Sequence, residues 1–71
     1  MGIREILAFN MRRRRNELGI SQEDLADSAS LDRTYISSLE RCRYGATIDV
    51  VAKLALALGV DPIDLLRSPP A

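Results

Sequence analysis

Apolar residues recur every three or four positions along most of this chain, and short polar segments interrupt the pattern. This spacing is typical of amphipathic helices, and it differs from the strict alternation expected of a half-buried strand. The pattern predicts five helices, at about residues 3–18, 22–29, 33–41, 48–58 and 62–66.

Residues suited to helix ends support these boundaries. Serine, threonine and aspartate side chains accept a hydrogen bond from the first free amides of a helix, and glycine readily adopts the left-handed conformation that ends one. Proline fits the first helical position because its missing amide needs no partner there. The expected caps are Ser21, Asp32, Thr47 and Asp61 followed by Pro62, and the expected stops are Gly19 and Gly59.

The same spacing predicts which side chains face the core. Arg14 falls in the middle of the apolar face of the first helix, where we expect its side chain to extend along the apolar surface to water, unless the helix departs from this register. The short side chain of Ala26 lets the second and third helices cross closely, as in a helix-turn-helix. The inward residues are expected to be Ile3, Ile6, Leu7, Met11, Leu18, Leu25, Ala26, Ala29, Ile36, Leu39, Ile48, Val51, Leu54, Ala55 and Leu58.

Length and composition exclude several classes of function. The 71 residues make one small domain, with no apolar run long enough for a membrane span and no signal-peptide core. With one cysteine, Cys42, and no histidine, the chain cannot build a disulfide framework, a zinc finger or a histidine-based catalytic site. We therefore expect no enzyme activity, no metal and no cofactor.

The formal net charge is zero, but the charges are unevenly placed. Residues 1–19 hold five arginines against two glutamates, and residues 20–45 hold three arginines against five acids. A helix spreads the four successive arginines at 12–15 over about 300° of its circumference, so they cannot form one basic stripe. Placement matters more than the total charge, because a polyanion responds to the face presented to it.

Three stretches resemble the Cro/C1-type (XRE) family of DNA-binding proteins, which includes phage repressors: LGISQEDLA at 18–26, YISSLER at 35–41 and LALALGV at 54–60. The resemblance covers about residues 4–66. It implies an all-α, compact five-helix lambda-repressor-like fold with a helix-turn-helix at about 22–41. It also implies a single domain over 1–71, in which residues 67–71 form a frayed tail.

The resemblance further implies how DNA is bound. The third helix enters the major groove, and the start of the second lies against a phosphate. Arg33 matches the two acceptors of guanine, although it could instead clamp a phosphate or pair with Asp32 or Glu17. Tyr35 could bind a phosphate or simply pack on the helix edge. The implied positions are Arg33, Thr34, Ser37 and Ser38 for bases, Gln22, Tyr35, Arg41 and Arg43 for phosphates, and Arg15 with Glu40 as a structural ion pair.

Two positions depart from the family pattern, which usually has glycine at each. Ser30, in the turn of the helix-turn-helix, must adopt or avoid a left-handed backbone. Cys42 follows the third helix beside Arg41 and Arg43, which could lower the pKa of its thiol and make it a redox switch. The alternative is a small residue tolerated at a helix end.

The resemblance implies a homodimeric, sequence-specific regulator of transcription that binds an inverted-repeat operator on double-stranded DNA. As a repressor or controller protein in the cytoplasm it would block or touch RNA polymerase, with no membrane partner. Because the chain ends soon after the fifth helix, we expect the dimer contact within the domain, at Val60, Pro62, Ile63, Leu65 and Leu66. The alternative function is an antitoxin-like module that binds a toxin and regulates its own synthesis through DNA.

Overall fold

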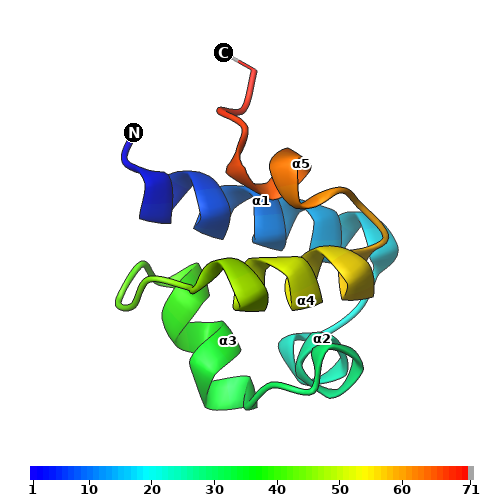
Figure 1. Cartoon of the computed structure of the whole chain (residues 1–71). Helices are drawn as coiled ribbons and strands as arrows, with labels where there is room; N and C mark the ends of the chain where they lie inside the picture. The colour runs from blue at the N-terminus through cyan, green and yellow to red at the C-terminus, as the bar shows by residue number, and fades with distance from the viewer. Residues whose placement is uncertain (71) are drawn as a thin grey trace.

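The computed structural model describes residues 1–70, which fold into five α-helices without a β-strand. Figure 1 shows α1 and α4 running side by side, with α2 and α3 below α4 and the short α5 on the opposite side. The all-α five-helix architecture is confirmed. The helices are α1 (Ile3–Leu18), α2 (Gln22–Ala29), α3 (Arg33–Glu40), α4 (Ile48–Leu58) and α5 (Pro62–Leu66).

Side-chain caps set the starts of α2, α3 and α4. The hydroxyl of Ser21 accepts a hydrogen bond from the amide of Asp24 at 3.0 Å, and the carboxylate of Asp24 accepts one from the amide of Ser21 at 3.2 Å. Asp32 and Thr47 each accept one hydrogen bond from a first-turn amide, both at 3.1 Å. These local bonds explain why the predicted starts agree with the structure, since a cap depends on only a few neighbouring residues.

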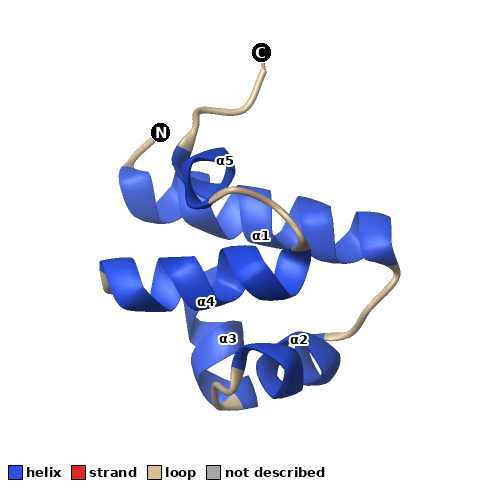
Figure 2. Ribbon diagram, turned by 45° about the vertical axis from the view of Figure 1, so that its right-hand side comes forward, coloured by secondary structure: helices blue, strands red, loops and turns tan. Residues whose placement is uncertain are grey.

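The core lies where α1 and α4 pack against the helix-turn-helix, and α5 covers α1 and α4 on the opposite side, as Figure 2 shows from a second side. Ala26 is 2% exposed, which fits its predicted place between α2 and α3. None of the helices within residues 1–70 is long and apolar enough to cross a membrane. The largest fully buried side chains are Met11, Leu25, Ile36, Leu39, Leu54, Leu58 and Leu65.

Three residues predicted to face inward lie at the surface instead. Ile3 is 59% exposed, Leu18 is 42% exposed and Ile48 is 84% exposed. Ile3 and Ile48 are the first residues of α1 and α4, and Leu18 is the last residue of α1. Helical periodicity places a residue on a face, but it does not show where the neighbouring helix ends. The predicted inward positions were therefore wrong at these helix ends.

Arg14 lies where the periodicity puts it, and it has a structural use there. Its Nε donates a hydrogen bond to the carbonyl of Leu58 at 2.9 Å, and its Nη1 lies 3.4 Å from Oε1 of Glu17. The carbonyls in the last turn of a helix have no partner within that helix, and a cation is favourable at that end. The Arg14 guanidinium therefore closes the C-terminal end of α4 while remaining partly exposed.

Asn10 performs the same task for α5, and sequence reasoning missed it. The side chain is 2% exposed, and its amide nitrogen donates to the carbonyls of Leu65 at 2.9 Å and of Arg67 at 2.8 Å. Its carbonyl oxygen accepts a bond from Arg13 at 3.3 Å. These bonds attach α5 and the start of the following segment to α1. Residues 67–70 are not helical, and the last position of the predicted tail, Ala71, lies outside the described residues.

Candidate nucleic-acid interface

Helix α3 has one anchored side and one free side. Ile36 and Leu39 are 0% and 1% exposed and fix the helix against the core. Arg33 and Thr34, in its first turn, are exposed, and Ser37 is half-buried on the second turn. The first half of α3 therefore presents an arginine and two hydroxyls on a rigid backbone.

Ser38 does not join that exposed set. It is 8% exposed and counts among the buried polar residues. Four residues along from Thr34, it lies one turn closer to α1, and α1 packs against α3. Its hydroxyl offers a base edge very little surface, so we remove Ser38 from the predicted base-reading residues.

The surroundings of Arg33 exclude the alternative that it forms an ion pair with Asp32 or Glu17. Within residues 1–70 it forms no ion pair with Asp32, Glu17 or any other acid. Arg33 lines a shallow depression together with Gln22 at the start of α2. The guanidinium and the first turn of α2 therefore share one surface, and the charge of Arg33 is available to a ligand.

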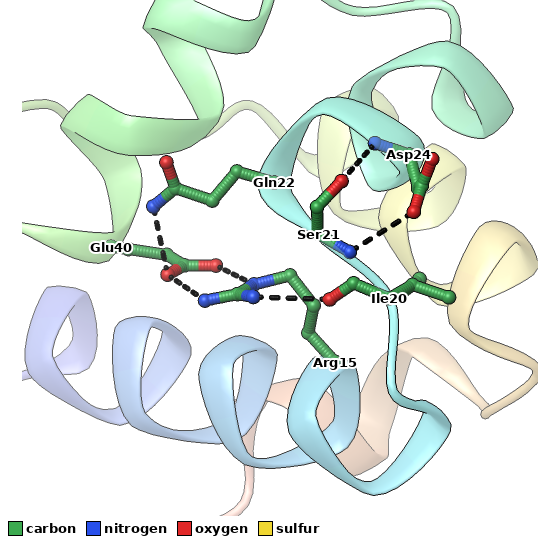
Figure 3. A network of polar contacts seen from close by, with 6 residues as sticks. All are labelled: Arg15, Ile20, Ser21, Gln22, Asp24 and Glu40. Atoms are coloured by element: carbon green, nitrogen blue, oxygen red, sulfur yellow. Dashed lines mark hydrogen bonds and ion pairs between the residues drawn. The ribbon is translucent and has the colours of Figure 1, made fainter.

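A buried ion pair sets the geometry between α1, α2 and α3 (Figure 3). Nε of Arg15 lies 2.8 Å from Oε2 of Glu40, and its Nη2 lies 3.0 Å from Oε1. Arg15 also donates to the carbonyl of Ile20 at 3.1 Å, and Gln22 donates to Glu40 at 3.2 Å. The hydrogen bond to Glu40 raises the pKa of Arg15 above its ordinary value, although burial opposes this. The ion pair implied by the resemblance is present.

Gln22 was expected to bind a phosphate, and its hydrogen bond to Glu40 limits the orientation in which its side chain can do so. An amide nitrogen carries two hydrogens, and Glu40 accepts only one of them. The half-buried side chain is therefore held in one orientation with a second donor still available. This arrangement is compatible with the expected phosphate contact.

The segment between α3 and α4 carries the remaining expected phosphate contacts. Arg41 and Arg43 are exposed, and neither forms an ion pair with another of residues 1–70. The hydroxyl of Tyr35 donates to the carbonyl of Gly45 at 3.4 Å, so this tyrosine joins α3 to the segment as well as packing on the helix. Tyr44, which directly follows Arg43, is 61% exposed. It was not singled out from the sequence, although an aromatic residue beside arginines is a signal for nucleic-acid contact.

Both positions that depart from the family's glycine adopt the left-handed conformation. Ser30 has φ 55° and Cys42 has φ 60°. Ser30 therefore tolerates this backbone rather than avoiding it. The thiol of Cys42 is half-buried, and it lies 3.8 Å from the carbonyl oxygen of Arg4, to which it donates. Residues 1–70 contain no cluster of three or more potential metal-binding side chains.

The residues expected to form the dimer contact differ in their exposure. Ile63 is 65% exposed and Leu66 is 36% exposed; Pro62 is exposed and Val60 is half-buried. Leu65 is only 1% exposed because it packs into the core, so it has no surface to offer a second copy and is removed from the expected contact. Leu56 on α4, which is 84% exposed, was not predicted as part of any contact.

Comparison with known proteins identifies the family. Residues 11–65 match the sequence model of a family described as helix-turn-helix. The chain belongs to this helix-turn-helix family, of the Cro/C1 (XRE) type. The resemblance carried by the three sequence motifs is therefore confirmed.

Two curated relatives are similar over most of the chain. A Neisseria hypothetical transcription factor from Neisseria meningitidis serogroup B is 46% identical over 67 residues, covering 94% of this chain and 63% of that protein. Control protein C.SmaI of Serratia marcescens is 46% identical over 66 residues, covering 93% and 79% of the two chains. The present chain thus spans less than two thirds of the Neisseria protein.

Solved structures agree with the fold. The crystal structure of the hypothetical transcription factor NHTF from Neisseria matches with a TM-score of 0.93 at 46% identity, covering 96% of this chain and 78% of that one. The restriction-modification controller protein C.Esp1396I, crystallised as a tetramer with its natural 35 base-pair operator, matches with a TM-score of 0.84 at 34% identity, covering 92% and 86%.

Proposed function

We propose that this protein is a regulator of transcription that binds double-stranded DNA sequence-specifically, as a homodimer on an inverted repeat. The observation that carries the proposal is α3, whose inner side is fully buried and whose first turn presents an unpaired Arg33. Base reading needs such a rigid helix, because a side chain held loosely cannot discriminate between base edges.

The roles divide between base edges and phosphates. Arg33 donates two bonds to guanine in the major groove, while Thr34 and Ser37 make adaptable contacts nearby. Gln22 binds a phosphate at the start of α2, and the segment after α3 binds the opposite flank through Arg41 and Arg43. Tyr35 positions that segment through Gly45 and lies close to the same phosphates.

Two copies provide the symmetry of the operator. The contact uses the exposed residues of α5 and its flank, namely Ile63, Leu66, Pro62 and Val60. Two recognition helices in such a dimer would lie roughly 34 Å apart, one turn of DNA. The similar controller C.Esp1396I was crystallised as a tetramer with an operator, which supports assembly on DNA for this chain too. Acting in the cytoplasm without enzyme activity, the protein controls access of RNA polymerase by occupying its operator.

Selection from random duplex DNA tests this function. Purified protein is incubated with a random pool, and the retained duplexes are sequenced after several rounds. We expect an inverted repeat whose half-sites lie about one helical turn apart. The Arg33→Ala variant, with its fold checked by circular dichroism, is selected in parallel and should lose one position of each half-site. An unenriched pool from folded wild-type protein would contradict the proposal and favour a module that binds another protein.

A further inference from the structure

The first turn of α1 lies against the segment that follows α3. The carbonyl oxygen of Arg4 is 3.8 Å from the thiol of Cys42, although the two residues are 38 positions apart in the chain. Figure 1 shows the start of α1 and this segment at the same end of the molecule. Arg4 therefore belongs spatially with the expected phosphate-binding segment, despite lying outside the helix-turn-helix.

Gly45 gives the Arg4 side chain room over that segment. A Cβ atom built on Gly45 would lie 3.2 Å from Nε of Arg4 and 3.5 Å from its Nη2. Gly45 does not have a positive φ, so its backbone conformation does not itself require glycine. What glycine provides here is space, and the Arg4 guanidinium occupies it. The hydroxyl of Tyr35 donates a hydrogen bond to the carbonyl of the same glycine at 3.4 Å.

The charge of Arg4 is unused within the described chain. Arg4 is exposed and forms no ion pair with any of residues 1–70. The adjacent acid, Glu5, accepts a hydrogen bond from the amide of Gly2 at 2.9 Å and so serves the start of the helix. Arg4, Arg41 and Arg43 thus supply three exposed guanidinium groups, from α1 and from the segment packed against it, without a neutralising partner among these residues.

We propose that Arg4 binds a DNA phosphate next to those bound by residues 41–45, extending the DNA contact from the helix-turn-helix to the first turn of α1. This inference rests on the proposed function. A phosphate is the ligand expected of this group, because the guanidinium lies against Gly45, in the segment whose arginines are proposed to bind phosphates. Such a contact adds affinity without sequence preference.

The salt dependence of binding measures a phosphate contact directly. Affinity is measured between low and moderate salt for a duplex carrying the selected inverted repeat and for a shuffled duplex of equal length. Neutralising Arg4 in Arg4→Gln should flatten the slope of log affinity against log salt by about 0.9 per protomer bound. Both duplexes should weaken by the same factor, and Arg4→Lys should keep the wild-type slope. Arg67→Gln removes an equal charge beside α5 and should leave the slope unchanged.

Neutral methylphosphonates placed one at a time along the selected duplex locate the contact. At one phosphate flanking each half-site, we expect the replacement to weaken the wild type and to leave Arg4→Gln unaffected. If the wild type prefers the selected duplex but Arg4→Gln shows the same salt slope as the wild type, only the role of Arg4 is overturned. Wild-type protein that binds both duplexes equally would contradict the proposed function, and binding to neither would contradict both. Unfolding temperatures confirm that the variants are folded.

Discussion

The guanidinium of Arg15 and the carboxylate of Glu40 meet through two hydrogen bonds, at 2.8 Å and 3.0 Å, and join α1 to the last residue of α3. Only 15% of the Arg15 side chain and 4% of the Glu40 side chain are exposed. The pair fixes the end of the recognition helix, and through Gln22 it also fixes the start of α2. One contact therefore orients both elements that face the proposed DNA.

Removing one partner of this pair should destabilise the fold more than replacing both partners with apolar residues. We expect Arg15→Met or Glu40→Leu to lower the free energy of unfolding by about 3–5 kcal/mol, because each leaves a buried charge without its partner. The double variant should be less destabilised than either single variant. Urea unfolding of all three measures this. A double variant as unstable as the sum of the singles would contradict the account of a buried, coupled pair.

The left-handed residues Ser30 and Cys42 carry backbone strain that glycine would relieve. At φ 55° and 60° a side chain costs about 1–2 kcal/mol, part of which is offset by the greater freedom of glycine in the unfolded chain. We expect Ser30→Gly and Cys42→Gly each to raise the unfolding free energy by about 0.5–1 kcal/mol. Ser28→Gly, within α2, is the matched control and should lower it. Equal losses at positions 28 and 30 would show that the turn is not strained.

The side chain of Asn10, on α1, should stabilise the attachment of α5 far more than an exposed side chain of α1 does. Replacing it with alanine leaves the carbonyls of Leu65 and Arg67 without their donor, and an unsatisfied buried acceptor costs about 1–3 kcal/mol. Amide exchange should accelerate in residues 63–67 of Asn10→Ala. Asn16→Ala, on the exposed side of α1, is the control and should exchange as the wild type does.

An aspartate at Ile63 should dissociate the proposed dimer without unfolding the protomer, because this side chain is 65% exposed. Sedimentation of Ile63→Asp should give the mass of one chain, and its affinity for the selected repeat should fall. Leu18→Asp, an equal change at the exposed end of α1, should remain dimeric. An unchanged mass for Ile63→Asp would place the contact elsewhere, for example at the exposed Leu56.

The sequence was sufficient for the fold but only partly for the surfaces. Helix starts were predictable because capping involves neighbouring residues, as at Ser21 and Thr47. The predicted inward position of Ile48 was wrong because exposure depends on where other helices end. Asn10 could not be recognised, since an asparagine at a helical position does not reveal the distant carbonyls that it binds.

The candidate site shows the same division. Arg15 and Glu40 could be paired because the family resemblance, which extends over about residues 4–66, covers both positions, and the structure contains the bond. Ser38 was assigned to base reading from the family resemblance, and Leu65 to the dimer contact from the apolar character of the fifth helix, yet both are buried. In a helix of five or eight residues, a small rotation moves a side chain from the surface to the core, and only the packing of neighbouring helices fixes it.

The central claim, that Arg33 reads a base from α3, is tested most directly by exchanging each base pair of the selected half-site in turn. At one position the exchange should cost the wild type about 1–3 kcal/mol of binding free energy and cost Arg33→Ala almost nothing. Arg43→Ala should keep the wild-type pattern, with uniformly weaker binding and a salt slope flatter by about one unit. If Arg33→Ala instead retained the full wild-type pattern at lower affinity, Arg33 would be a phosphate contact and the assignment of base reading would be wrong.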